Sequence, residues 1–208
     1  MEAIRKAAVI GAGVMGAGIA AQFANAGVPV LLLDIVPAGA SNRNVLAETA
    51  ISNMLKTDPA PFMSARAAKW VTAGNVEDHL AQISDCDWII EAVTEVLDVK
   101  QALYRKIDAL RRPGSAVSSN TSTIPLRLLT RGLSDNFTRD FLITHFFNPP
   151  RYMRLMEIVT GTNTDPQLAR TVCDFADHVL GKSIVRCKDS PGFIANRLGV
   201  YWLQVGVV

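Results

Sequence analysis

Two titratable residues stand in apolar surroundings within "ITHFFNPPRYMRLMEIV", residues 143–159. His145 ends one apolar run, and Glu157 lies inside a second run in which every other side chain should face the same way. Because the "NPP" segment forces the chain to turn, the two runs can form strands that place His145 beside Glu157. A carboxylate on one ring nitrogen would fix the tautomer and leave the other nitrogen as a general base. The alternatives are a hydrogen-bonded core histidine and a glutamate that faces solvent on an edge strand.

A glycine-rich segment, "VIGAGVMGAGIAAQFANAGVPVLLLD", carries a second kind of chemistry. Gly11, Gly13 and Gly16 follow a predicted strand and open a predicted helix, and Asp34 closes the next strand. In a dinucleotide-binding turn these glycines permit the tight turn, the close approach of the pyrophosphate and the helix–strand packing. Free N–H groups at the helix N-terminus would then bind the phosphates. Asp34 would accept hydrogen bonds from the ribose hydroxyls and repel a 2′-phosphate, which favours NAD over NADP; FAD is a minor alternative.

Polar residues follow another predicted strand in "SSNTSTIP", residues 118–125. Strand ends of this kind line the ligand-binding crevice of doubly wound sheets. The alternative is a helix cap, with Ser122 or Thr123 preceding Pro125.

The segment "KDSPGFIANR", residues 188–197, allows two similar interpretations. Ser190 followed by Pro191 is a good helix start. Asn196 would then lie in the first turns, where its side chain can point back into the crevice.

These residues need a frame of alternating strands and helices. Short apolar runs alternate with longer helical patterns, which predicts an α/β fold of the Rossmann type, a doubly wound and mostly parallel sheet with helices on both faces. Residues 37–70 predict a helical pair inserted after the second strand and broken at "DPAP", and residues 165–182 predict a helix that begins with Asp165 and Pro166. The predicted strands are residues 7–10, 30–33, 88–92, 116–118, 141–144 and 183–187, together with the run around Glu157.

The last segment, residues 189–208, begins like a helix and stays apolar on most sides, at positions 194, 198, 201, 202, 205 and 208. Such a helix needs a partner that buries it. We therefore expect a dinucleotide-binding domain over residues 1–188, and a linker and first helix of a truncated helical C-terminal domain over residues 189–208.

Composition excludes several function classes. Of 208 residues, 49% are hydrophobic and 19% charged, the formal net charge is +2, and the basic residues are scattered, so we expect no nucleic-acid partner. No uninterrupted apolar run reaches the ~20 residues of a membrane span. Cys86, Cys173 and Cys187 are too few and too widely spaced for a disulfide framework or a metal site, which indicates a cytoplasmic protein without a bound metal.

Five motifs in this order, "GAGVMGAGIA", "EAVTEVLDVK", "SSNTSTIP", "HFFNPPRYMRLMEIV" and "KDSPGFIANR", resemble the NAD-binding domain of L-3-hydroxyacyl-CoA dehydrogenase over essentially the whole chain. The resemblance implies oxidation of a fatty acyl-CoA 3-hydroxyl with NAD in β-oxidation, an acyl-CoA substrate, and a homodimer formed through the C-terminal domain. "PPRYMRLMEIV" is similar to large bacterial multifunctional versions, to which a hydratase region can be fused.

The resemblance also implies roles for single residues. His145 matches the general base, Glu157 the acid that orients it, Ser122 a serine that hydrogen-bonds the reacting oxygen, and Asn196 an asparagine near the substrate carbonyl and the nicotinamide. The alternative for Glu95 and Lys100 is an exposed helix face. The residues expected at the cofactor are Gly11, Gly13, Val14, Met15, Gly16, Asp34, Ala92, Glu95, Lys100, Asn120, Ser122 and Asn148.

Two other functions fit the same scaffold. One is a sister NAD-dependent dehydrogenase of a small hydroxy acid or sugar acid without CoA, and the other is an inactive NAD-binding module. The inserted segment lacks an obvious basic patch for the CoA phosphates, since its basic residues (Arg43, Lys56, Arg66 and Lys69) follow no pattern. Without the helical domain we expect residues 1–208 to be poorly active.

Overall fold

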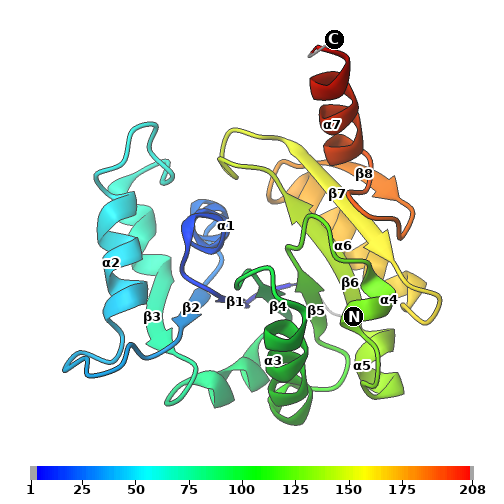
Figure 1. Ribbon diagram of the computed structural model, residues 1–208. Helices are drawn as coiled ribbons and strands as arrows, with labels where there is room; N and C mark the ends of the chain where they lie inside the picture. The colour runs from blue at the N-terminus through cyan, green and yellow to red at the C-terminus, as the bar shows by residue number, and fades with distance from the viewer. Residues whose placement is uncertain (1–3, 207–208) are drawn as a thin grey trace.

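The computed structural model describes residues 4–206. Its centre is an eight-stranded sheet in the order β3-β2-β1-β4-β5-β6-β7-β8, and neighbouring strands run parallel except at β6–β7 (Figure 1). The strands are β1 (Ala7–Ile10), β2 (Val30–Asp34), β3 (Val71–Asn75), β4 (Trp88–Glu91), β5 (Ala116–Ser119), β6 (Phe141–Phe146), β7 (Leu155–Thr160) and β8 (Ser183–Cys187).

Helices cover both faces of this sheet. On one face α1, α2 and α6 pack against side chains such as Val9 and Ile90; on the other, α3, α4 and α5 pack against side chains such as Ile10 and Ile89. Consecutive strand residues thus enter opposite cores, which explains the unbroken apolar runs of the central strands. The helices are α1 (Val14–Asn25), α2 (Val45–Met54), α3 (Leu97–Leu110), α4 (Leu126–Leu129), α5 (Asp135–Arg139), α6 (Pro166–His178) and α7 (Ala195–Val205), with 3₁₀ helices η1 (Ala65–Trp70) and η2 (Leu80–Asp85).

The order of the strands fixes where a ligand can bind. The chain moves outward from β1 through β2 to β3, and then crosses back to β4 on the other side of β1. Ligands of open α/β sheets bind at the carboxyl ends of the strands beside such a reversal. The structure confirms the Rossmann-type, doubly wound fold, and the site is expected at the carboxyl ends of β1, β4 and β5.

The inserted segment differs from the expected helical pair. Its first half forms α2, but residues 55–64 are irregular and the second half is the 3₁₀ helix η1, whose Ser64 side chain accepts a bond from Arg66 N. Pro59 and Pro61 in "DPAP" lack backbone donors, so a regular helix cannot run through them. The following strand β3 was not predicted, because "VTAGN" is short and contains a glycine and an asparagine.

The expected helix start at Ser190 and Pro191 is wrong. Gly192 (φ +71°) and Phe193 (φ +46°) adopt left-handed conformations that a right-handed helix excludes, so α7 begins only at Ala195. Figure 1 shows α7 projecting away from the sheet. Its apolar side chains are exposed, with Trp202 at 74%, whereas the predicted apolar position 208 lies outside the described residues.

Within residues 4–206, no helix is long and apolar enough to cross a membrane. All three cysteines of this part of the chain are free thiols.

Candidate active site

The glycine loop joins β1 to α1 and has room only for hydrogen at two of its positions. Gly11 has a φ of +106°, and a Cβ there would lie 2.4 Å from the carbonyl oxygen of Ala92. A Cβ on Gly16 would lie 1.7 Å from the carbonyl oxygen of Gly11. By contrast, a Cβ on Gly13 would meet nothing within 4 Å, so this residue borders open space. These are the turn, packing and approach positions of a dinucleotide-binding loop.

Asp34, at the end of β2, fastens this loop. Its Oδ2 accepts a hydrogen bond from Ala12 N at 2.6 Å, and its Oδ1 accepts one from Ile35 N at 2.7 Å. A carboxylate has about four acceptor positions, so two remain for the hydroxyl groups of a ligand. Asp34, Gly11, Gly13 and Ala92 line a cleft of about 600 Å³. The open backbone at Gly13 and the acceptor at Asp34 therefore fit the pyrophosphate and ribose of a dinucleotide.

The histidine and the glutamate face each other across the antiparallel pair β6–β7, where His145 and Glu157 are register partners. The distance between His145 Nδ1 and Glu157 Oε2 is 2.8 Å, with His145 6% and Glu157 1% exposed. An ionised carboxylate only accepts, so Nδ1 carries the proton and Nε2 is left with a lone pair. The alternative in which Glu157 faces solvent is wrong.

The second oxygen of Glu157 holds the chain that leads into α7. Oε1 accepts hydrogen bonds from Ile194 N at 3.0 Å and Ala195 N at 2.8 Å. Burial alone would raise the pKa of Glu157, but the hydrogen bonds from His145 and from these two amides hold that pKa below its usual range. Phe193 packs against the His145 ring with centroids 5.9 Å apart. The pair is thus fixed from both sides.

A second cleft, of about 370 Å³, gathers most of the predicted site residues. The Asn196 side chain lines this cleft and donates from Nδ2 to Ser122 O at 3.2 Å, so α7 contacts the loop after β5. Predicted site residues that line this cleft are Met15, Ala92, Glu95, Lys100, Asn120, Ser122, His145, Asn148 and Asn196.

Three predicted residues lie elsewhere. Gly16 packs against the glycine loop, Glu157 is buried behind His145, and Val14 faces a third cleft, of about 530 Å³, between α1, α2 and the turn after β6. Asn148, joined to Pro149 by a cis peptide bond, borders both this cleft and the one at His145.

Asn120 has a structural contact besides its place in the cleft. Its Oδ1 accepts a hydrogen bond from Phe146 N at 2.9 Å and so joins the end of β5 to the end of β6.

The helix-cap interpretation of "SSNTSTIP" is wrong. Neither Ser122 nor Thr123 caps α4, because the carboxylate of Asp189 accepts from Leu126 N at 2.6 Å and from Arg127 N at 3.1 Å. This leaves Ser122 beside the cleft rather than at a helix end.

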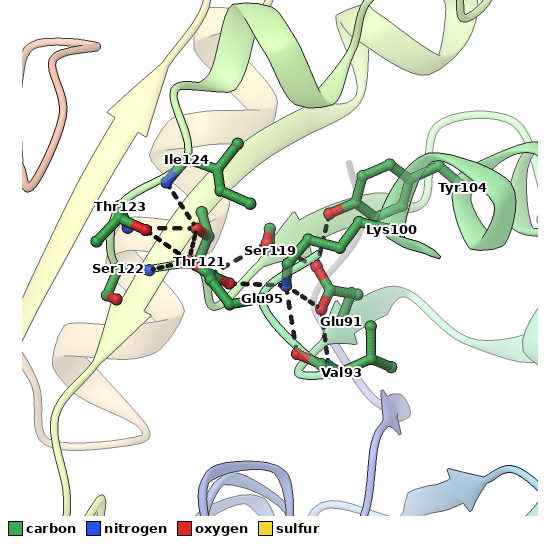
Figure 2. A network of polar contacts seen from close by, with 10 residues as sticks. All are labelled: Glu91, Val93, Glu95, Lys100, Tyr104, Ser119, Thr121, Ser122, Thr123 and Ile124. Atoms are coloured by element: carbon green, nitrogen blue, oxygen red, sulfur yellow. Dashed lines mark hydrogen bonds and ion pairs between the residues drawn. The ribbon is translucent and has the colours of Figure 1, made fainter. Parts of the chain in front are cut away.

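Lys100 is not on an exposed helix face. It is 1% exposed, and its Nζ lies 2.7 Å from Glu91 Oε1 and 3.1 Å from Glu95 Oε2 (Figure 2). Burial would raise the pKa of Glu95, but the hydrogen bond from Thr121 and the charge of Lys100 hold it below its usual range.

Glu91 was missed at the level of sequence. It ends β4, is fully buried, and also accepts hydrogen bonds from Tyr104 Oη at 2.6 Å and Ser119 Oγ at 2.7 Å (Figure 2). The signal was present in "WIIE", because a carboxylate that closes an apolar run needs partners, as Glu157 does.

A doubly wound sheet with a glycine loop, an acidic residue that ends β2, and a histidine–carboxylate pair at the carboxyl ends of its strands is typical of the dinucleotide-binding domain of a dehydrogenase. The chain belongs to the family "3-hydroxyacyl-CoA dehydrogenase, NAD binding domain", whose model matches residues 6–190. The family binds NAD, which removes the FAD alternative.

Individual relatives agree with this assignment. A probable 3-hydroxyacyl-CoA dehydrogenase of Deinococcus radiodurans is 50% identical over 95% of the chain, and one of Bacillus subtilis is 47% identical over 98%. The chain spans only 57% and 28% of these two proteins. The crystal structure of 3-hydroxybutyryl-CoA dehydrogenase from Escherichia coli K12 matches 98% of the chain, and 43% of its own length, with a TM-score of 0.81 at 29% identity.

Proposed function

We propose that the complete protein oxidises the 3-hydroxyl group of an L-3-hydroxyacyl-CoA to a ketone in fatty acid β-oxidation, with His145 as the general base. The observation that carries this proposal is the buried pair of His145 and Glu157. His145 lines a cleft that adjoins the one proposed for the dinucleotide. An inactive NAD-binding module would not need a buried carboxylate that holds one histidine tautomer.

Proton removal is assigned to His145. Its Nε2 takes the proton of the substrate hydroxyl, and the resulting imidazolium is stabilised by Glu157 through the 2.8 Å bond at Nδ1. The chemistry that NAD⁺ supplies when bound is acceptance of a hydride from the substrate C3. The C–H and O–H bonds break, and the carbonyl double bond forms.

Two other residues of the same cleft are proposed to orient the substrate. The Ser122 hydroxyl would donate a hydrogen bond to the reacting oxygen, and Asn196 would lie near the thioester carbonyl. Their support is that both line the cleft with His145 and contact each other through the Asn196–Ser122 hydrogen bond.

The residues proposed to hold NAD are those predicted from the sequence. The glycine loop would take the pyrophosphate, Asp34 the ribose hydroxyls, and Glu95 and Lys100 the end of the cofactor that lies beside His145. Their support is that all of them except Val14 and Gly16 line the two clefts, which share Ala92.

The third cleft favours a thioester over a small hydroxy acid. It adjoins the cleft at His145 through Asn148, and most of its lining is apolar, for example Ala17, Met54 and Pro149. A small polar acid has no use for such a surface, whereas an acyl or pantetheine chain does. We assign no residue to the CoA phosphates. Arg43, one of the basic residues of the inserted segment, already pairs with Glu77 and Asp78 at 2.7 Å each.

The domain division, the assembly and the location are also part of the proposal. Residues 1–188 would form the NAD domain, and residues 189–208 would lead into a helical domain through which two copies associate. The exposed apolar face of α7 and the greater length of the relatives support this. Free thiols at all three cysteines suit the reducing cytoplasm.

A competition assay with the complete protein tests the substrate. NADH oxidation is followed with acetoacetyl-CoA and, separately, with free acetoacetate and other small oxo acids. We expect turnover of the CoA thioester to exceed that of the free acids. Preference for a free acid would establish the sister dehydrogenase instead, and no turnover of any of them would favour the inactive module.

A further inference from the structure

Five residues at the cleft of His145 form a closed ring of polar contacts through their side chains and one backbone amide, which Figure 2 shows from close by. Lys100 Nζ bonds Glu91 Oε1 at 2.7 Å and Glu95 Oε2 at 3.1 Å. Thr121 Oγ1 donates a short hydrogen bond to Glu95 Oε1, and Thr121 N donates to Ser119 Oγ at 3.1 Å. Ser119 Oγ donates to Glu91 Oε2 at 2.7 Å, which completes the ring.

The ring joins two segments that are distant in sequence, residues 91–100 and residues 119–121. Glu91 and Ser119 end the neighbouring strands β4 and β5, whereas Lys100 lies on α3. Tyr104, one helical turn after Lys100, donates to Glu91 as well. Burial, and then the charge of Glu91, raise the pKa of Tyr104 well above its usual value, so its hydroxyl keeps its proton and remains a donor.

The loop after β5 takes its backbone hydrogen bonds from this ring. The amide of Thr121 donates to Ser119, that of Ser122 to Glu95 at 3.1 Å, and those of Thr123 and Ile124 to Thr121 Oγ1 at 3.4 and 3.0 Å. Four consecutive amides are therefore bonded to side chains rather than to a strand or helix. The backbone of Ser122 is therefore held by Glu95 of the ring and by Asn196, and not by a strand ladder.

We propose that Glu91 is a positioning residue that acts through Lys100 and Ser119 to hold Glu95 and the loop carrying Ser122 in the geometry of the active site. Glu91 itself is fully buried and lines none of the described clefts at the site, so it acts through the other members. Its consequence for turnover depends on the proposed function, whereas its hold on the loop does not.

Glu91→Gln is the direct test. In the unmodified protein, Glu91 Oε2 accepts from Ser119 and Tyr104, and Oε1 accepts from Lys100 and Val93 N. The substitution keeps the shape of the side chain, but an amide NH₂ replaces one of these two oxygens, so the side chain can no longer accept at both positions. Hydrogen–deuterium exchange of residues 121–124, resolved by NMR, is expected to become about tenfold faster, as for loss of roughly one hydrogen bond.

Asp140→Asn is the matched control. Asp140 forms a comparably buried ion pair with Arg111 at 2.7 Å, but it precedes β6 and so lies at the opposite end of the sheet from the site. This variant should lose stability without faster exchange in residues 121–124. Equal exchange in the two variants, at temperatures equally far below their melting points, would overturn the proposal.

Should Glu91→Gln fail to fold, Ser119→Ala opens the same ring and is expected to give the same exchange pattern. Unchanged exchange of residues 121–124 in Ser119→Ala would also overturn the proposal.

The kinetic arm uses the complete protein and acetoacetyl-CoA. We expect kcat/KM to fall about 10–10²-fold in Glu91→Gln, since misplacement of a contact residue by about 1 Å costs that much. Asp140→Asn should stay within about twofold, because distant sites seldom couple. Absence of turnover in the unmodified protein would refute the proposed function. The exchange data would still test whether Glu91 holds the loop of residues 121–124. Faster exchange with unchanged kcat/KM would overturn the positioning role.

Discussion

At the scale of single residues, the proposed function depends on carboxylates that already accept hydrogen bonds from the protein, such as Asp34 and Glu157. The Asp34 carboxylate accepts hydrogen bonds from Ala12 N and Ile35 N, which hold it in place without a ligand. A carboxylate held in this way would accept hydrogen bonds from the ribose hydroxyls of NADH and would repel the 2′-phosphate of NADPH. We therefore expect the chain to bind NADH more tightly than NADPH.

Asp34→Ala should lower the ratio of NADH affinity to NADPH affinity by about tenfold or more. The substitution removes the repulsion between the Asp34 carboxylate and the 2′-phosphate, and a like-charge contact costs several kcal/mol. Calorimetric titration of both nucleotides measures the effect. Equal affinities of the unmodified protein for NADH and NADPH would show that Asp34 does not contact the ribose.

Glu157 makes stability depend on pH. Its pKa is lower in the folded chain than in the unfolded chain, so the folded state binds fewer protons over the range between the two values. The resulting stability is fully present above the unfolded-state pKa of roughly 4.3 and is lost as the pH falls through the lower, folded-state pKa.

Glu157→Gln should therefore melt at a lower temperature than the unmodified protein at pH 7, and the gap should close toward pH 3. Thermal unfolding followed by circular dichroism across this range is the measurement. A gap that stays constant with pH would mean that the charge of Glu157 contributes nothing to stability.

The pattern at residue scale could be predicted only in part. The alternation around Glu157 and the turn at "NPP" together allowed the pairing of His145 with Glu157 to be predicted from the sequence as one of several possibilities. Asp189 capping α4 and the ring around Glu91 were not, because each joins segments that only the tertiary fold brings together. Lys100 resembled a solvated helix residue for the same reason.

At the scale of elements, the connection from β1 to α1 is the most constrained. A Cβ on Gly16 would overlap the Gly11 carbonyl, so Gly16→Ala must push the helix away from the loop. We expect a loss of about 1–3 kcal/mol in stability and weaker NADH binding. Gly199→Ala on α7 is the control, since a Cβ there meets nothing within 4 Å and alanine favours the helix. Denaturant unfolding and NADH titration compare them, and equal behaviour of the two variants would contradict the packing argument.

Periodicity predicted most elements correctly because the central strands are buried on both faces and read as continuous apolar runs. It failed where backbone conformation decides. The left-handed pair Gly192 and Phe193 delays α7, and the second half of the inserted segment forms the 3₁₀ helix η1 instead of an α-helix. β3 is an edge strand whose composition carries little signal.

At the scale of the whole molecule, cofactor binding and substrate oxidation differ in the parts of the protein that they require. The cleft at Asp34 and Gly13, proposed for the cofactor, is lined by β1, β2, α3 and the loops that follow β1 to β4, whereas the cleft at His145 also includes Asn196 of α7. In the proposed enzyme a helical domain closes over the substrate, and excluding water is part of catalysis.

Residues 1–208 alone should consequently bind NADH but reduce acetoacetyl-CoA far more slowly than the complete protein. The exposed apolar side chains of α7 should also cause self-association, detectable by light scattering. Calorimetry and steady-state assays on both chains provide the comparison. Equal turnover would mean that the substrate site is complete within residues 1–208 and that no closing domain is needed.

The central claim, that His145 is the general base, is tested most directly by His145→Gln in the complete protein, with steady-state turnover of acetoacetyl-CoA and NADH affinity measured on the same preparation. Glutamine keeps a polar side chain near Glu157 but cannot accept the substrate proton as a base. The account predicts a fall in kcat of about 10²–10⁴-fold with NADH affinity unchanged. Turnover close to that of the unmodified protein would contradict it.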